Sequence, residues 1–177
     1  MARVFEGDTP MRIYICRHGE AQPHAMSGRD LDRRLTQKGR LQARYLASVL
    51  GGLDPAERPR RLLASPAART LETAQALADE LGLGITTLRD LLPNCETGVA
   101  MGVIERHLEH EHLVVVGHNP TMTSLLSVLA HGPSAGCSMP GPALKTGHMA
   151  IVDVAASCNP GTATMLALHR YEPATVT

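Results

Sequence analysis

Apolar residues in this chain form short runs, and longer stretches with apolar positions at helical spacing lie between them. The runs predict buried strands at residues 11–16, 61–64, 85–88, 112–117, 148–154 and 164–169. The helical spacing predicts helices at residues 36–50, 66–81, 97–110 and 120–130, with a Gly- and Pro-rich loop over 131–147. Because strands and helices alternate through most of the chain, we expect an α/β fold of three layers, α/β/α, with a mainly parallel sheet.

Glycine, proline and short polar residues mark the ends of these helices. Thr36 precedes the first helix, and Gly51-Gly52 ends it. Ser65-Pro66 and Asn119-Pro120 each predict an N-cap residue followed by proline in the first helical position. Gly82 predicts the end of the second helix.

Three of the predicted strands run directly into polar turns. The first turn is Arg17-His18-Gly19, the second leads to Arg69, and the third contains His118. In parallel sheets ligands bind beyond the carboxyl ends of the strands, so we expect the three turns to meet at one edge. Two of them also lead into helix N-termini, which attract anions. Two arginines, two histidines and helix N-termini in one place predict a phosphate site.

Composition limits the possible partners. The 177 residues fit a single domain spanning residues 1–177, in which residues 1–10 are a candidate disordered extension before Met11. Seventeen basic residues balance seventeen acidic ones and aromatic residues make up 2%, so we expect no nucleic-acid and no membrane partner. No export signal or CxxC spacing is present, so we expect a cytoplasmic protein with reduced thiols. Cys16, at the end of a buried strand, is expected to be a core residue that points away from the site.

Taken together, the three turns resemble the histidine phosphatase superfamily (branch 1), which includes the phosphoglycerate mutase-like enzymes. The motifs are Arg17-His18-Gly19, Arg-Thr-Leu-Glu-Thr-Ala at 69–74 and Val-Gly-His-Asn-Pro at 116–120, and they occur in the family's order. The likeness extends from about residue 11 to 132, and more loosely to the end of the chain. It implies a phosphoglycerate mutase-like fold and a covalent phosphohistidine mechanism that needs no metal and no other cofactor.

The resemblance also implies roles for individual residues. His18 would attack phosphorus, and Arg17 and Arg69 would bind the phosphoryl oxygens. His118 would donate a further hydrogen bond. Residue chemistry agrees, because neutral imidazole is a nucleophile at pH 7 and guanidinium groups fork around phosphoryl oxygens. Glu96 is the candidate general acid by its position in the family's layout, although a solvated loop carboxylate accounts for it better.

Residues 30–39 point to one subfamily. Their sequence, Asp-Leu-Asp-Arg-Arg-Leu-Thr-Gln-Lys-Gly, is similar to the Asp-x-x-Arg-Pro-Leu-Thr-x-x-Gly segment of SixA-type phosphohistidine phosphatases, with Arg34 in place of proline. The short spacing between Arg69 and His118 leaves no room for the large insertion of the glycolytic mutases. An open site of this kind suits a phosphorylated protein, such as a histidine phosphotransfer domain.

Four further residues are candidates for substrate binding: Gly19, Asp30, Arg33 and Asn119. Asp30 and Arg33 fit equally well as ordinary surface charges. Glu20 is a second carboxylate next to the first motif.

Three other functions stay open at this point. A small phosphomonoesterase acting on phosphorylated metabolites would use the same residues with a working acid at Glu96. A non-catalytic phosphate-binding module would use them without forming a phospho-enzyme. A metal-dependent hydrolase would be built on His107, His110 and His112, although a solvated charged turn accounts for these three better.

Overall fold

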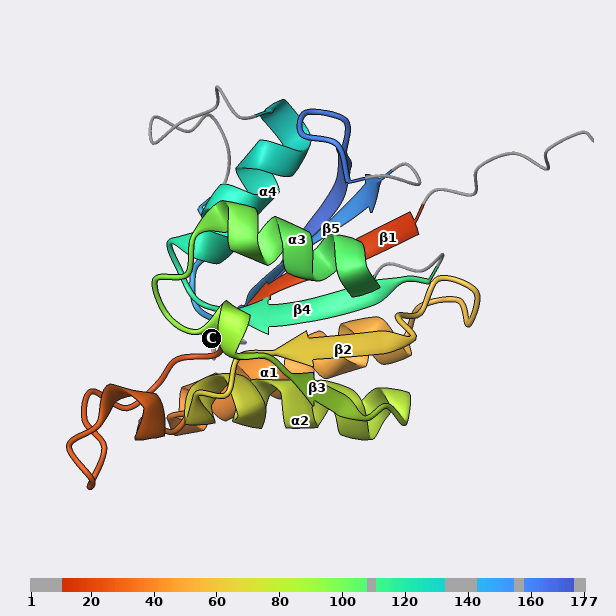
Figure 1. Ribbon diagram of the computed structural model, residues 1–177. Coiled ribbons are helices and arrows are strands. Elements are labelled where there is room, and N and C mark those ends of the chain that lie inside the picture. Colours follow the sequence, from red (N-terminus) through yellow and green to blue (C-terminus); the bar gives the residue numbers. More distant parts are fainter. Residues whose placement is uncertain (1–10, 108–110, 133–142, 155–157, 174–177) are drawn as a thin grey trace, which may run out of the picture.

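The computed structural model describes residues 11–107, 111–132, 143–154 and 158–173. Its centre is one six-stranded sheet with the strand order β3-β2-β4-β1-β5-β6 (Figure 1). The strands are β1 (Met11–Arg17), β2 (Arg61–Ala64), β3 (Ile85–Thr87), β4 (Leu113–Gly117), β5 (His148–Val154) and β6 (Thr164–Arg170). The first four strands are parallel, and β5 joins β1 in antiparallel fashion and pairs with β6 in the same way. The expected mainly parallel sheet is confirmed.

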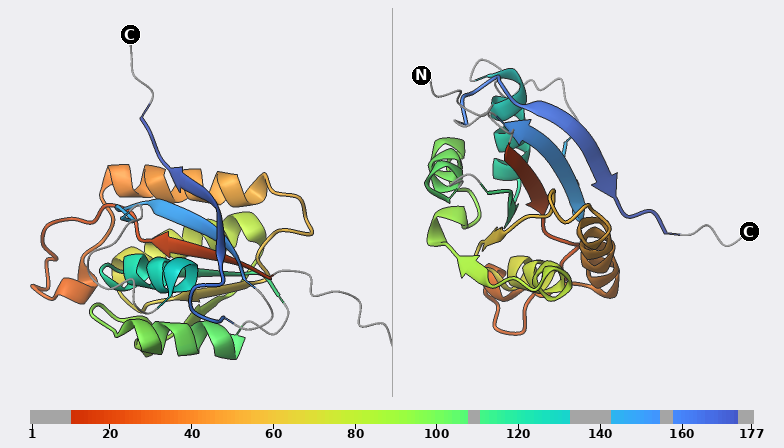
Figure 2. Two further views of the ribbon diagram at one scale, coloured as in Figure 1. Left: turned by 90° about the horizontal axis from the view of Figure 1, so that it is seen from above. Right: turned by 90° about the vertical axis from the view of Figure 1, so that its right-hand side faces the viewer.

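Helices cover both faces of this sheet, so the expected three layers are present (Figure 2). The buried side chains of α1 (Gln37–Gly51) and α2 (Ala68–Leu81) pack on one face. Those of α3 (Thr97–His107) and α4 (Thr121–His131) pack on the other. Two 3-10 helices, η1 (Asp30–Asp32) and η2 (Arg89–Leu91), lie in the connections. No helix among the described residues is long and apolar enough to cross a membrane.

Alternation along β1 divides the core in two. Ile13 and Ile15 face the α3–α4 layer, whereas Tyr14 and Cys16 face the α1–α2 layer. Cys16 is completely buried, and its burial raises the pKa of the thiol to about 12. The sulfhydryl group is therefore a small core group, as expected.

The helix ends follow the local signals in part. The Thr36 side chain accepts a hydrogen bond from Gly39 N at 3.0 Å and caps α1, and Gly82 ends α2 with a φ of 67°. The predicted N-cap at Ser65 is wrong, because α2 begins only at Ala68 and Ala67 precedes it. The Ser65 hydroxyl instead forms a hydrogen bond with His118, which directly follows β4. Pro120 stands one position earlier than expected, immediately before α4.

One buried polar residue on α1 joins three segments. Gln42 lies on the buried face of the helix. The apolar spacing placed Leu41 on that face, but Leu41 is exposed. The Oε1 of Gln42 accepts from Glu20 N at 2.7 Å, and its Nε2 donates to Thr146 O at 3.1 Å. Gln42 therefore fixes the chain after β1 against the chain before β5, on one side of the carboxyl end of the sheet.

Candidate active site

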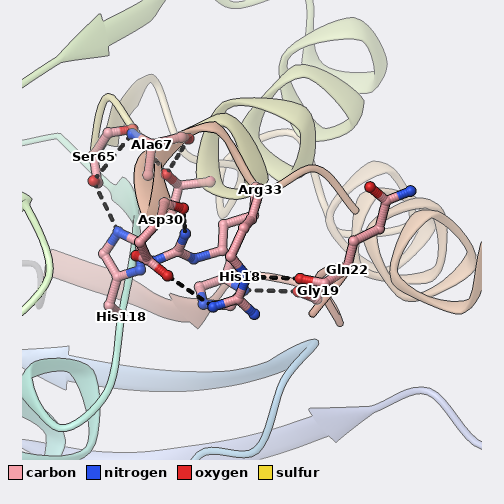
Figure 3. Close-up of polar contacts among 10 residues, drawn as sticks. His18, Gly19, Gln22, Asp30, Arg33, Ser65, Ala67 and His118 are labelled. Carbon is pink, nitrogen blue, oxygen red and sulfur yellow. Dashed lines mark hydrogen bonds and ion pairs between the residues drawn. The ribbon is translucent and has the colours of Figure 1, made fainter. Parts of the chain in front are cut away.

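The three polar turns meet where the parallel strands end. In the sheet register Arg17 lies beside Gly117, and Ala64 lies beside Val116, so the chain leaves β1, β2 and β4 at one level. His18 N donates to Gly117 O at 3.2 Å. The His18 and His118 rings consequently lie edge to face, with their centroids 5.1 Å apart (Figure 3).

The hydrogen bond of the His18 ring determines which nitrogen can act as a nucleophile. His18 Nδ1 lies 2.7 Å from the carbonyl oxygen of Gly19 (Figure 3). Because a carbonyl oxygen can only accept, Nδ1 carries the proton and Nε2 carries the lone pair. The ring is only 7% exposed, so the Nε2 lone pair is held in one orientation in a nearly dry position.

The His18 ring is neutral at physiological pH. Burial is the main reason that its pKa falls to about 4, and the positive charges of Arg69 and Arg17 lower it further. The hydrogen bond to Gly19 O acts in the opposite direction. The same arginines that can bind a phosphoryl group thus keep the neighbouring imidazole unprotonated.

His118 is also buried and neutral, with 3% of its surface exposed. Burial, followed by the influence of His18 and Arg69, lowers its pKa to about 3. Its Nε2 lies 2.9 Å from the Ser65 hydroxyl (Figure 3), while its buried Nδ1 has no hydrogen-bond partner among the described residues. Such an unpaired buried atom is costly unless a ligand or water completes it.

Arg17 has hydrogen-bond donors that no described residue accepts from. Its Nη1 donates to Leu144 O at 3.0 Å, and its buried Nε has no partner in the described part of the chain. The side chain is half-buried, and burial lowers the pKa of the guanidinium from its ordinary value. No carboxylate of the described residues pairs with this charge, so the group favours an incoming anion.

Arg69 lies in the first turn of α2 and is 5% exposed. Its Nη1 donates to Asp30 O at 2.7 Å, and its Nη2 donates to Asp30 Oδ2 at 2.9 Å. Asp30 Oδ1 accepts from Arg33 Nη1 at 2.8 Å, and Arg33 Nε donates to Gln22 O at 2.6 Å. The two arginines lower the pKa of the Asp30 carboxyl, Arg33 having the larger effect. Asp30 and Arg33 therefore connect the outer loop to the buried Arg69.

Gly19 allows two backbones to approach closely at the site. A Cβ on Gly19 would lie 2.5 Å from Gly39 O, and a Cβ on Gly39 would lie 2.0 Å from Glu20 O. Gly19 N also donates to the hydroxyl of buried Thr73, at 3.1 Å. The glycine thus serves to place the chain after His18 against the start of α1.

Asn119, a candidate substrate contact, holds the chain segment that contacts Arg17. Its Nδ2 donates to Leu144 O at 2.7 Å, and its Oδ1 accepts from Thr123 Oγ1 at 3.0 Å. Leu144 O therefore accepts from both Asn119 and Arg17. This geometry gives Asn119 a means of positioning Arg17.

Two carboxylates near the site differ in their surroundings. Glu20 pairs with Lys38 Nζ at 3.1 Å and accepts from Thr36 Oγ1 at 3.0 Å, and these contacts lower its pKa, which disfavours a proton-donating role. Glu96 is exposed just before α3. The carbonyl of the preceding residue, Cys95, accepts from Thr121 Oγ1 at 2.7 Å, which holds this turn against the start of α4.

The histidines considered as metal ligands have separate partners. His107 Nδ1 donates to Val103 O at 2.8 Å, and His112 Nδ1 accepts from Arg12 N at 2.9 Å. His110 lies outside the described residues. Across residues 11–107, 111–132, 143–154 and 158–173, no group of three or more His, Cys, Asp or Glu side chains could hold a metal ion.

Sequence reasoning missed Ser65 as a partner of His118, Thr73 as a partner of Gly19, and Leu144 as the acceptor for Arg17. Ser65 could have been noticed, because a hydroxyl directly after β2 sits at the same sheet edge as the histidines. Leu144 could not, because a backbone carbonyl in a loop leaves no mark in the sequence.

The sequence and the fold are similar to those of known phosphatases. The model of the histidine phosphatase superfamily (branch 1) matches residues 13–99. A protein assigned as phosphohistidine phosphatase SixA from Agrobacterium tumefaciens is 27% identical, with a TM-score of 0.74 over 92% of this chain and 99% of that one. The protein histidine phosphatase SixA solved with tungstate is 25% identical, with a TM-score of 0.74 over 90% and 97%.

A mycobacterial glucosyl-3-phosphoglycerate phosphatase shares the fold, with 16% identity and a TM-score of 0.68 over 88% of this chain and 97% of that one. No curated protein sequence matches the chain. With a phosphoglycerate mutase-like sheet and the three motifs at its carboxyl edge, the chain matches the histidine phosphatase superfamily, branch 1, and its fold is that of phosphatases.

Proposed function

We propose that this phosphatase removes phosphate from phosphohistidine on a signalling or phosphotransfer protein, through a covalent phosphohistidine intermediate on His18. One observation carries the proposal: His18 is buried and neutral, its Nδ1 proton is directed to Gly19 O, and its ring lies near His118 and under the influence of the Arg69 and Arg17 charges. This is the protonation state that an attacking imidazole needs.

The reaction has two steps. Nε2 of His18 forms a bond to phosphorus while the bond from phosphorus to the substrate's imidazole nitrogen breaks. Water then attacks the phosphorus, the Nε2–phosphorus bond breaks, and inorganic phosphate leaves. The unpaired Nε donor of Arg17 is available to the phosphoryl oxygens in both steps, and Arg69 retains guanidinium protons beyond those given to Asp30. When the Ser65 hydroxyl donates to His118 Nε2, the proton of the neutral His118 ring is on Nδ1, which is then a further donor.

The need to protonate the leaving group favours phosphohistidine over a phosphate ester as the substrate. A substrate imidazole can take up its proton before it leaves, so a strong general acid is not required. An alkoxide requires one, and the carboxylate nearest to the motif, Glu20, has a lowered pKa and a lysine partner. The two SixA structures are also more similar to this chain than the metabolite phosphatase is.

A small-molecule phosphomonoesterase is the second candidate. It is favoured by Glu96, an exposed carboxylate beside the start of α4, and by neighbours named for phosphorylated metabolites. A non-catalytic phosphate-binding module is a third and weaker candidate, because nothing in the His18 geometry blocks attack. Glu96→Gln separates the first two: ester hydrolysis should fall about 100-fold if Glu96 protonates the leaving group, while phosphoramidate hydrolysis should barely change.

The first experiment follows phosphate release from a phosphorylated histidine phosphotransfer domain and, separately, from a panel of phosphomonoesters. Wild type is compared with His18→Ala and with a matched control, His24→Ala, which removes an exposed histidine of the loop after β1. We expect fast release from the phosphoprotein by wild type and His24→Ala, and none by His18→Ala. Fast release from one ester alone would move the function to the metabolite class, and activity that survives His18→Ala would contradict the mechanism.

A further inference from the structure

A groove of about 590 Å³ lies between α1 and α2, and the proposed mechanism makes no use of it. The small side chains of Ala43 and Ala76 leave room between the two helices. Arg40 and Arg44 line the groove from α1, and Gln75 and Asp79 line it from α2. All four of these residues are exposed.

The positive charges in this groove are only partly neutralised. Arg34 closes one end and pairs with Glu72 at 2.5 Å, while the other oxygen of Glu72 accepts from Leu35 N. Arg40 reaches only a backbone oxygen, Leu35 O, at 2.9 Å, and the Arg44 side chain has no hydrogen bond or ion pair to any described residue.

Two unpaired arginines at this spacing do not stabilise α1. Arg40 and Arg44 are one helical turn apart, and like charges four residues apart repel each other. Both nevertheless face the same groove. Their spacing matches that of two carboxylates one turn apart on another helix, so an acidic helical segment is the ligand that this surface fits.

Two lining residues of the groove, Arg34 and Glu72, lie close in sequence to residues of the active site. Arg34 follows Arg33, which binds Asp30 and through it Arg69. Glu72 lies about one turn after Arg69 on α2. Arg34 is also the residue that stands in place of the proline in the SixA-type segment.

We propose that the groove between α1 and α2 is the docking site for an acidic helical segment of the phosphorylated protein substrate, with Arg40 and Arg44 as its anion-binding groups. The proposal rests on the proposed function, because it assumes that the phosphoryl group arrives on a protein. Docking there would place the partner beside the loop that carries Asp30 and Arg33.

The catalytic test uses Arg44→Glu, which removes no contact within the protein. Its matched control is Arg60→Glu, an exposed arginine before β2, at the other end of the sheet, with the same change in net charge. With a phosphorylated histidine phosphotransfer domain, we expect Arg44→Glu to raise KM about tenfold and to leave kcat unchanged. Phosphoramidate hydrolysis should be the same in all three proteins, and added salt should raise KM more for wild type than for Arg44→Glu.

A binding test is independent of catalysis. A polyglutamate peptide should shift the backbone amide resonances of α1 and α2 in wild type and Arg60→Glu, and not in Arg44→Glu. No shift in wild type, together with an unchanged KM in Arg44→Glu, would overturn the docking role of the groove and would not affect the proposed function. The peptide could instead bind in the groove of a wild-type protein that hydrolyses only esters. That result would overturn both the proposed function and the docking of a protein substrate, and would leave the groove as an anion-binding surface.

Discussion

Arg12 and Arg17 lie near opposite ends of β1, and they differ in whether a carboxylate pairs with the guanidinium group. Arg12 pairs with Asp153 at 2.7 Å and with Glu57 at 2.9 Å, and the hydrogen bond to Asp153 is the main reason that its pKa is raised. Arg17 pairs with no described carboxylate, keeps a buried Nε without a partner, and has a pKa lowered by burial.

Two histidines show the same contrast. His112, which directly precedes β4, accepts a hydrogen bond from Arg12 N. His118, just beyond the other end of β4, has a buried Nδ1 without a partner among the described residues. Arg12 and His112 at the amino end of the sheet are paired within the chain, whereas Arg17 Nε and His118 Nδ1 at the carboxyl end are left for a ligand. The amino end should therefore govern stability and the carboxyl end activity.

The largest expected effect is the loss of activity when Arg17 is substituted. Arg17→Met should lower kcat/KM for phosphohistidine hydrolysis by about 100- to 1,000-fold, because a preorganised donor to the transferring group is lost. The free energy of unfolding should stay equal or rise, since an unpaired buried charge is removed. Phosphate release and urea unfolding measure the two. A variant that is destabilised and fully active would reverse the assignment of this end of the sheet.

The next effect is a pH dependence of stability that originates at the carboxyl end. The His18 pKa is about 4 and the His118 pKa is about 3 in the folded protein, against 6.5 for ordinary histidine. Between pH 6.5 and 4 the unfolded chain binds more protons, so stability falls as pH falls, by up to about 3 kcal/mol for His18.

Urea unfolding at a series of pH values checks this effect. The slope of stability against pH between 6.5 and 5 should be smaller in His18→Asn and in His118→Asn than in wild type. The exposed His24→Asn should keep the wild-type slope. Equal slopes in all four proteins would contradict the buried, neutral state of the two site histidines.

Arg12→Met tests the opposite end. Loss of the pair with Asp153 leaves a largely buried carboxylate without its partner, so the free energy of unfolding should fall by about 2 kcal/mol. The kcat of the folded variant should not change. Adding Asp153→Leu should restore part of the stability, because no unpaired charge then remains. A loss of kcat without a loss of stability would show that the two ends are not separate.

The smallest expected effect concerns the carbonyl that Arg17 and Asn119 share. Asn119→Ala should lower kcat about tenfold by loosening the Leu144 segment against which Arg17 is held. Thr123→Val should have a similar effect, since Thr123 bonds both Asn119 and Leu144 N. If Asn119 instead binds substrate directly, Asn119→Ala should raise KM while Thr123→Val leaves both constants unchanged.

Local signals in the sequence predicted the strands well where a strand, such as β4, is an apolar run in the buried centre of the sheet. Ile13 and Val115, for example, are completely buried, as such runs require. Helix boundaries were less certain where a polar residue had a competing partner. Ser65 has the character of an N-cap, yet its hydroxyl bonds His118, which is distant in the sequence. The helical spacing likewise left out Gln42, whose burial depends on backbone groups from two distant loops.

By itself, the sequence determined the α/β alternation and the motifs around Arg17, His18, Arg69 and His118, because apolar periodicity and short motifs are local properties. Only the tertiary structure decided that β5 and β6 join the sheet in antiparallel fashion and that Asp30 reaches back to Arg69. It also decided the protonation state of His18, which arises from burial and from charges brought in by distant segments. The arginine-lined groove belongs to the same class, since it exists only where α1 and α2 pack side by side.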